Sequence, residues 1–497
     1  MGWRFVGGLV GLVLTSLALG ARAAEPDLTR MSPAELVAFA KAMPKGGELH
    51  NHVSGAIFGE TWLDWAAQDG LCVDIKALAF APPCQPGDTL KPATAVAADE
   101  TLRQAMLDSL SVRHSGFLDR SGHDQFFTAF QRFGLAGARR DGDALAEVLN
   151  GLARQNTFYL EAMIGAQSVA VRVAGAKAGW KGGDFAAQKA ALTAAGLEAL
   201  VPAAIAETDA LEARTRAVMK CGTPGAAPGC QVTVRYLFSA NRIIPPEQTF
   251  AQIQFAVALI AADKRWVGVQ LVAPEDNPAS IANYRLHMRM VDFLTEHGRK
   301  IPVALHAGEI TAKYATPAEL AYHVSDAVRV AGARRIGHGT DIAGEDGAEA
   351  LAAEMAANGV LVEVNLSSNA AILEVAPKDH PYAWLRARGV AASLSTDDAG
   401  ILRIDLSREY GRAVETGATY GDLKRSARNA IAFSFLSGVG LWDDPGVYRK
   451  PAKACAGEIG AAAPKPGACA DLVALSDKAR EQWRHEYLLK AFEAGWK

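Results

Sequence analysis

Histidines and carboxylates stand at the ends of several short apolar stretches of this chain. His50 and His52 end the first stretch, His306 ends the fifth and Asp397 ends the eighth. In His50-Asn51-His52 the two imidazoles point to the same side of a strand, because side chains alternate with period two. Three imidazoles and one carboxylate suit zinc, so we predict that these four residues bind one Zn²⁺ per chain.

Three more polar residues accompany these candidate ligands. Glu309 follows His306 by a short step, His338 lies between two glycines, and Asp398 follows Asp397. A divalent metal lowers the pKa of a bound water to roughly 7 and so supplies a nucleophile. Glu309 and His338 are then candidates for proton transfer in a metal-assisted hydrolysis. Taken singly, each motif also fits a structural histidine or a helix cap.

Eight apolar stretches rich in β-branched residues predict eight strands, with helical patterns at 281–298, 317–331 and 348–358 between them. Regular alternation of strand and helix favours a closed (β/α)8 barrel over an open sheet. The carboxyl ends of barrel strands converge on one face, where chemistry is done. Distant candidate residues would therefore share one pocket. The predicted strands are 47–53, 157–165, 233–242, 266–274, 300–308, 334–342, 360–369 and 390–398.

The predicted barrel occupies residues 24–440, with helical insertions at about 66–155 and 167–232. Insertions on a barrel usually shape the pocket mouth or a subunit contact, so we expect them to form a lid or a homodimer interface. Residues 441–497 form a C-terminal extension with a cysteine-bracketed loop and a terminal helix at 476–494.

Residues 1–23 have the pattern of a secretory signal peptide. Arg4 gives a positive start, residues 6–20 are apolar, and Ala21-Arg22-Ala23 provides a cleavage site. The alternative is an uncleaved anchor. No other stretch is long enough to span a membrane, so we expect a periplasmic or secreted protein without a membrane segment after cleavage.

The six cysteines agree with an oxidising compartment. They fall into three local pairs, each around a segment rich in Pro, Gly or Ala, and we predict three local disulfides. Free thiols are the alternative. The net charge is only -3, and no basic stripe indicates a nucleic-acid partner. The predicted pairs are Cys72–Cys84, Cys221–Cys230 and Cys455–Cys469.

In their order along the chain these motifs resemble the adenosine deaminase family of the metal-dependent amidohydrolase superfamily. The leader and insertions are similar to its secreted members, the adenosine deaminase growth factors. The resemblance covers about residues 44–401. It is carried by Met43-Pro44-Lys45, Glu48-Leu49-His50-Asn51-His52, His306-Ala307-Gly308-Glu309, Arg335-Ile336-Gly337-His338-Gly339, Glu363-Val364 with Ser368-Asn369, and Thr396-Asp397-Asp398.

The resemblance implies a role for each matching residue. His50, His52, His306 and Asp397 would bind zinc. Glu309 would protonate N1 of the purine, His338 would orient and help deprotonate the attacking water, and Asp398 would bind the purine N7. Water would add at C6, ammonia would leave, and adenosine would become inosine. The implied partner is a purine nucleoside, adenosine or 2′-deoxyadenosine.

Three places depart from the family pattern, and one of them is Asn365-Leu366, where members often show Cys-Pro. Ser54 stands where many members carry an Asp that contacts the ribose 5′-hydroxyl, and Ala273 stands where a Gly contacts the purine. Both are candidate substrate-binding residues. Because the changes affect the sugar and the ring edge, a related amidohydrolase for another aminopurine stays open. So does a non-catalytic secreted binding or signalling protein on the same fold.

Overall fold

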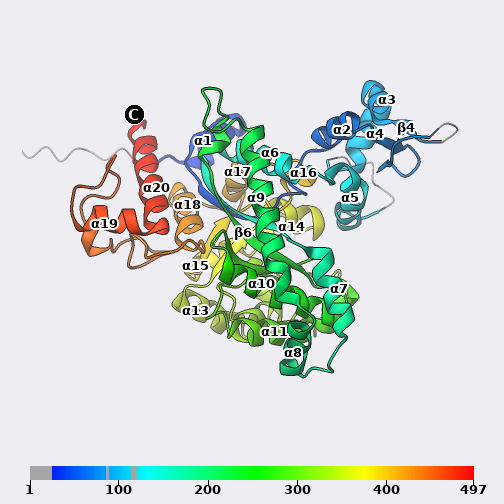
Figure 1. Cartoon of the computed structure of the whole chain (residues 1–497). Coiled ribbons are helices and arrows are strands. Elements are labelled where there is room, and N and C mark those ends of the chain that lie inside the picture. Colours follow the sequence, from blue (N-terminus) through cyan, green and yellow to red (C-terminus); the bar gives the residue numbers. More distant parts are fainter. Residues whose placement is uncertain (1–24, 86–88, 114–119, 497) are drawn as a thin grey trace, which may run out of the picture.

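A computed structural model describes residues 25–85, 89–113 and 120–496. The predicted signal peptide lies outside the described residues. Two parallel four-stranded sheets form the centre of the molecule (Figure 1). The first contains β1 (Gly46–His52), β5 (Thr157–Ile164), β6 (Thr233–Asn241) and β7 (Trp266–Val272). The second contains β8 (Ala304–Ala307), β9 (Arg335–His338), β10 (Leu361–Val364) and β11 (Ala391–Leu394).

Two parallel bridges join these sheets into a closed barrel. Val269 of β7 pairs with Val303 just before β8, and Asn51 of β1 pairs with Asp397 just after β11. The strand order around the barrel therefore follows the chain, which confirms the predicted (β/α)8 fold. The short strands β8 to β11 are buried throughout, as expected for a parallel sheet covered by helices.

Helices follow the barrel strands and cover their outer face. α11 begins behind Asn277, whose side chain accepts the N–H of Ala279, and α13 has the predicted bounds. The covering and connecting helices are α10 (Pro246–Ala262), α11 (Pro278–Thr295), α12 (His323–Arg329), α13 (Ala348–Asn358), α14 (Leu366–Ile372), α15 (Tyr382–Ala387), α16 (Ala399–Leu402), α17 (Leu406–Glu415) and α18 (Tyr420–Ala432), with α1 (Pro33–Ala42) ahead of the barrel.

Several predicted elements are shorter in the structure, among them the strands predicted at 300–308, 334–342 and 390–398, which are reduced to β8, β9 and β11. The stretch at 317–331 contains only the short helix α12, because a turn at Thr316 precedes it and Glu345 accepts the N–H groups of Val324 and Ser325 at its start. The predicted strand at 360–369 ends at Val364, where its pairing with β11 ends and α14 begins.

The segment between β1 and β5 projects from one side of the barrel (Figure 1). In this segment, the Trp62 ring of α2 stacks on Phe133 of α5 with centroids 5.0 Å apart. Its elements are α2 (Gly59–Gln68), β2 (Cys72–Asp74), β3 (Ala79–Ala81), β4 (Lys91–Pro92), α3 (Ala93–Ala98), α4 (Glu100–Ser109), α5 (Gly122–Gly137) and α6 (Asp141–Ala153).

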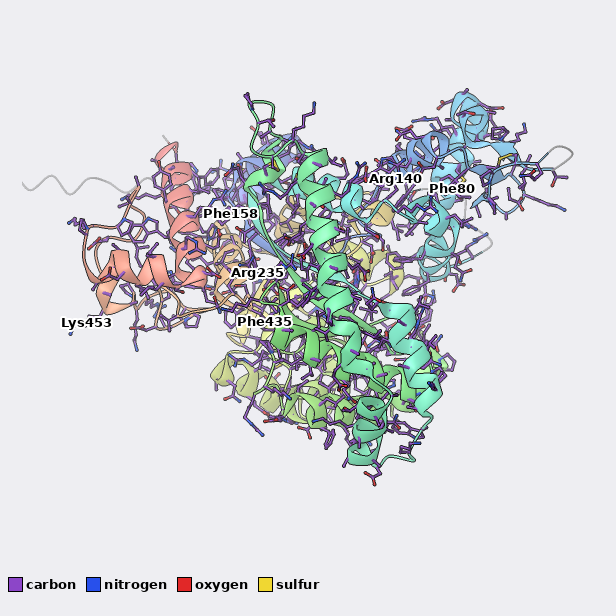
Figure 2. The ribbon with its side chains drawn as sticks, viewed as in Figure 1. Phe80, Arg140, Phe158, Arg235, Phe435 and Lys453 are labelled. Atoms are coloured by element: carbon purple, nitrogen blue, oxygen red, sulfur yellow. A yellow bond between two sulfur atoms is a disulfide. The ribbon has the colours of Figure 1, made fainter. Side chains whose placement is uncertain are left out.

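The segment between β5 and β6 forms α7 (Ser168–Ala178), α8 (Phe185–Ala194) and α9 (Val201–Val218), which pack on α10 and α6. Among the described residues no single helix could span a membrane, although residues 185–194 and 197–218 form a bent pair that could by length and composition. The extension carries α19 (Ala468–Leu475) and α20 (Asp477–Ala494). Lys453 of the extension and Phe80 of the segment between β1 and β5 lie on opposite sides of the molecule (Figure 2). The domain boundaries stay a prediction.

The three predicted disulfides are confirmed. Cys72 pairs with Cys84, Cys221 with Cys230, and Cys455 with Cys469. Each pair links residues 9 to 14 positions apart, and all three lie outside the eight barrel strands. The bonds therefore stabilise the peripheral segments and leave the barrel to its own packing.

Replacing Cys455 and Cys469 together by Ala should destabilise the folded chain. A closed loop of this length is worth about 3 kcal/mol in the chain-entropy model. Denaturant unfolding of the variant and the wild type, both without reductant, would measure the difference in their free energies of unfolding. The same comparison with all thiols reduced is the control, and there the difference should largely disappear. An equal unfolding midpoint under oxidising conditions would contradict the prediction.

Candidate metal and catalytic site

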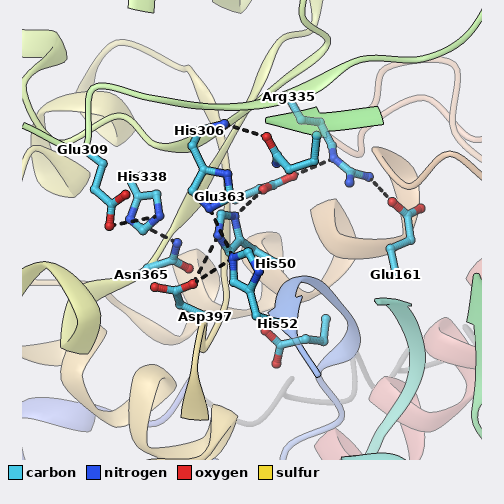
Figure 3. A network of polar contacts seen from close by, with 12 residues as sticks. His50, His52, Glu161, His306, Glu309, Arg335, His338, Glu363, Asn365 and Asp397 are labelled. Atoms are coloured by element: carbon cyan, nitrogen blue, oxygen red, sulfur yellow. Dashed lines mark hydrogen bonds and ion pairs between the residues drawn. The ribbon is translucent and has the colours of Figure 1, made fainter. Parts of the chain in front are cut away.

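The structure brings the four predicted metal ligands together. One nitrogen or oxygen from each of His50, His52, His306 and Asp397 lies within 4.8 Å of those of the others (Figure 3). Both His50 Nε2 and His52 Nε2 lie 3.4 Å from Asp397 Oδ1, and His52 Nε2 lies 3.2 Å from His306 Nε2. The cluster is at the carboxyl end of the strands, where barrels place their chemistry.

Closure of the barrel positions three of these residues directly. The Asp397 N–H donates to the His50 carbonyl (3.0 Å), and the His52 N–H donates to the Asp397 carbonyl (3.3 Å). Gly337 of β9 provides the space for the imidazole, because a Cβ there would lie 2.6 Å from His50 Cε1. The pairing of β1 with the residues after β11 therefore brings ligands from both sides together.

The donor set fits a metal cation. Within the part of the chain that the structure describes, the buried atoms His50 Nε2 and Asp397 Oδ1 have no hydrogen-bond partner, while His50 Nδ1 lies 2.7 Å from Glu363 Oε2. A carboxylate on Nδ1 leaves the Nε2 lone pair free for an ion. Burial lowers the pKa of His52 to about 4 and that of His306 well below its ordinary value, so both are neutral ligands.

The negative charge around His50 also favours a cation. Burial alone would lower the pKa of His50, but the nearby carboxylates of Asp397 and Glu363 raise it to about 10. The same carboxylates that hold a proton on this imidazole would stabilise a divalent ion in its place.

Glu309 and His338 lie beside the cluster, 3.5 Å apart from Oε1 to Nε2. Burial, and then the charge of Asp397, raise the pKa of Glu309 well above its ordinary value, which favours its protonated form. Burial lowers the pKa of His338 to about 3. The Asn369 amide is 3.0 Å from His338 Nδ1, which directs Nε2 toward the cluster. One side chain can thus give a proton and the other can accept one.

Asp398 is the third predicted residue at this edge, and it is buried. Burial and the neighbouring Asp397 raise its pKa well above the ordinary value. Gly55 makes room for it, because a Cβ at that position would lie 1.6 Å from Asp398 Oδ1. A protonated carboxyl in this place can donate a hydrogen bond to a ring nitrogen.

The two substituted positions that are candidate substrate-binding residues, Ser54 and Ala273, lie apart from each other. Ser54 is exposed and, with Val53 and Met163, lines a cavity of about 710 Å³ that runs between α6 and α9. Ala273 follows β7 at a φ of 89°, and its carbonyl accepts from Arg242 Nε at 2.8 Å. Their roles toward a substrate stay predictions.

A chain of buried charges behind His50 went unnoticed in the sequence. Glu363 Oε1 binds Arg335 Nε (2.7 Å), and Arg335 Nη1 binds Glu161 Oε2 (2.6 Å) (Figure 3). All three side chains are fully buried. The sequence did contain a sign of this chain of charges, because each of three apolar strands carries a charged residue. Such residues are almost never buried unless they are paired. The group links the ligand cluster to the middle of the barrel.

Replacing Glu363 by Gln should weaken metal binding by roughly 10- to 100-fold, because the charge that orients His50 and raises its basicity is lost. Competition with a chromophoric chelator would measure the dissociation constant. The control is Glu345→Gln, since Glu345 is also buried but binds the N–H groups at the start of α12. Equal metal affinity in both variants would show that Glu363 does not support the ligand.

Comparison with known proteins places this site in a family. Residues 140–439 match the sequence profile of the adenosine deaminase family, a range that starts after β1. An adenine deaminase from Rhizobium rhizogenes is 30% identical over 41% of this chain and 58% of its own length. An adenosine deaminase from Serratia proteamaculans is 34% identical over 27% of this chain and 38% of its own. These alignments thus span little more than half of each relative at most.

One solved structure shows the same fold. It is an N6-mAMP deaminase of Arabidopsis, which superposes with a TM-score of 0.51 over 80% of this chain and 96% of its own, at 20% sequence identity.

Proposed function

The chain belongs to the adenosine deaminase family, and we propose that it is a zinc-dependent aminohydrolase that converts adenosine and 2′-deoxyadenosine to the inosine products and ammonia. One observation supports this most strongly. Three imidazoles and a carboxylate meet at the carboxyl end of the barrel, beside Glu309, whose pKa is raised, and His338, whose pKa is lowered. Metal-assisted hydrolysis of a C–N bond uses an ion that activates water, an acid and a base.

Zinc held by His50, His52, His306 and Asp397 would polarise water and supply a nucleophile near neutral pH. The chain's own groups then move the protons. His338 is neutral and accepts the proton of the attacking water, while Glu309 gives its proton to N1 of the purine ring. Addition of water at C6 and loss of ammonia complete the exchange. The environment separates acid from base by pushing their pKa values apart.

The purine is held by its ring edge in this proposal. Burial and Asp397 raise the pKa of Asp398, and in its protonated form this carboxyl donates to N7, which is an acceptor in adenine and adenosine. Such contacts select a 6-aminopurine and leave the group at N9 open.

A purine with another N9 substituent is the second candidate substrate. Ser54 is uncharged, so it offers at most a neutral hydrogen bond to a 5′-hydroxyl and does not repel a 5′-phosphate. The relatives named above act on adenine, adenosine and N6-mAMP. The non-catalytic alternative is less favoured, since the acid, the base and the ligand Asp397 are all in place.

Helix α5 contacts the segments that follow β7 and β8. His123 near its start lies 3.1 Å from Asp276, which follows β7, and stacks on Tyr314, which follows β8. The catalytic Glu309 is only 7% exposed. We therefore propose that α5 is the predicted lid and moves when substrate enters. The alternative role of the insertions, a homodimer contact, stays a prediction.

The three disulfides suggest an oxidising compartment. Export by a leader at residues 1–23, and kinship with the secreted branch of the family, belong to the proposal. Both would make the substrate an extracellular or periplasmic purine.

A panel assay tests the proposed reaction. The full chain would be given adenine, adenosine, 2′-deoxyadenosine, 5′-deoxyadenosine, AMP and N6-methyl-AMP, with absorbance and ammonia release as readouts.

We expect the highest kcat/KM for adenosine, loss of activity after chelation and recovery with zinc. Because Ser54 is uncharged, 5′-deoxyadenosine should lose much less than 100-fold. A preference for adenine or AMP would favour the second candidate, and no turnover would favour the binding protein.

Replacing Glu309 by Gln should lower kcat by roughly 10²- to 10⁴-fold, because the amide cannot donate the proton that N1 needs. The zinc content should stay at one per chain, since Glu309 lies outside the four-ligand group. Steady-state kinetics and elemental analysis of the same sample would check both. Turnover near that of the wild type would show that another group protonates the purine.

A further inference from the structure

The segment from His306 to Glu309 carries both a metal ligand and the proton donor, yet only its first two residues belong to β8. Side chains from neighbouring strands hold its backbone. The His306 N–H donates to Gln270 Oε1 (2.6 Å), and the His306 carbonyl accepts from Arg242 Nη1 (3.0 Å). The peptide groups around the metal ligand are thus held by Gln270 of β7 and by Arg242, which follows β6.

Glu275 holds the next two peptide groups. Its Oε1 accepts the N–H of Gly308 and its Oε2 accepts the N–H of Glu309, each at 2.9 Å. His323 Nδ1 lies 2.5 Å from Oε1, and Arg242 Nη1 lies 3.7 Å from Oε2. These three side chains are buried, with Glu275 only 1% exposed. One carboxylate therefore binds two consecutive amides and two cationic or polar partners.

Glu275 is ionised in this setting. Burial alone would raise its pKa, but Arg242, His323 and the Glu309 N–H together lower it to about 2. Hydrogen bonds to a charged acceptor are roughly twice as strong as neutral ones. The carboxylate is thus a strong and permanent acceptor for both amides across the working pH range.

The segment needs this support because of Gly308. This residue has a φ of 76°, and a Cβ there would lie 2.3 Å from Asp341 Oδ1, so only glycine fits. Glycine is the most flexible residue of the backbone. Its carbonyl accepts from Thr340 N–H (2.9 Å), and its N–H is the one bound by Glu275. With both sides tied, the direction in which Glu309 leaves the backbone is fixed.

We propose that Glu275 is a positioning residue for catalysis, which sets the place of the Glu309 carboxyl through the two amides that it binds. This role rests on the proposed function, in which Glu309 gives the proton. Arg242 and His323 serve it by holding the Glu275 carboxylate in one orientation.

Replacing Glu275 by Gln tests the role. One oxygen becomes an NH₂ group that faces an N–H donor, so one of the two amides loses its acceptor. A displacement of about 1 Å at a catalytic group costs on the order of 100-fold in rate. We expect kcat to fall by about 10- to 100-fold, with an unchanged KM and an unchanged zinc content. Glu275→Asp, which keeps the charge on a shorter stem, should lose less.

The Glu309→Gln background separates positioning from general damage. If Glu275 acts through Glu309, adding Glu275→Gln to Glu309→Gln should lower kcat little further. The control is Glu481→Gln, a buried carboxylate on α20 that accepts the Thr233 hydroxyl and touches neither Glu275 nor its partners. Its effect on kcat, whatever its size, should be the same factor in both backgrounds.

The outcomes distinguish the two proposals. Wild-type turnover by Glu309→Gln alone would overturn the proposed function. An equal loss from Glu275→Gln in both backgrounds, a loss that appears in KM, or a loss of zinc would overturn only the role of Glu275. If Glu275→Gln does not fold, the same cycle with Glu275→Asp decides the question.

Discussion

Closure of the barrel between its first and last strands is the constraint on which the site depends. The two hydrogen bonds across this seam join Asp397 to the backbone of His50 and His52. His50 and His52 belong to the first barrel strand and Asp397 follows the last one, so these three ligands meet only when the seam is closed. A ligand set built into the strand register is held rigidly, which is what a metal with a defined geometry needs.

Buried charge is the second constraint. Burial of apolar side chains stabilises the fold, whereas burial of charged side chains costs free energy. Ionised groups in the interior cost several kcal/mol each unless partners compensate them. The group of His50, Glu363, Arg335 and Glu161 meets this cost by pairing alternate signs, and Glu275 with Arg242 does so behind His306. Such networks depend on all their members, so substitution of one leaves the others uncompensated.

The sequence was sufficient to predict the barrel and the ligand cluster, because His50, His306 and Asp397 each end an apolar run and such ends converge in this fold. It did not indicate Glu275, whose partners Gly308 and His323 are far away in the sequence. Its role depends on geometry that only tertiary contacts define. The early end of β10 was also missed, since the residues from Leu366 onward form helix α14 and do not extend the strand.

The three disulfides link cysteines that are near neighbours in the chain, separated by 9, 12 and 14 positions. In a chain that enters an oxidising space from its N-terminus, the two partners of each pair arrive one after the other. An oxidant that joins thiols in their order of arrival would therefore make the native bonds. Shuffling of disulfides, which takes minutes to hours without a catalyst, would then be unnecessary. Maturation of this protein should depend on an oxidase and hardly on an isomerase.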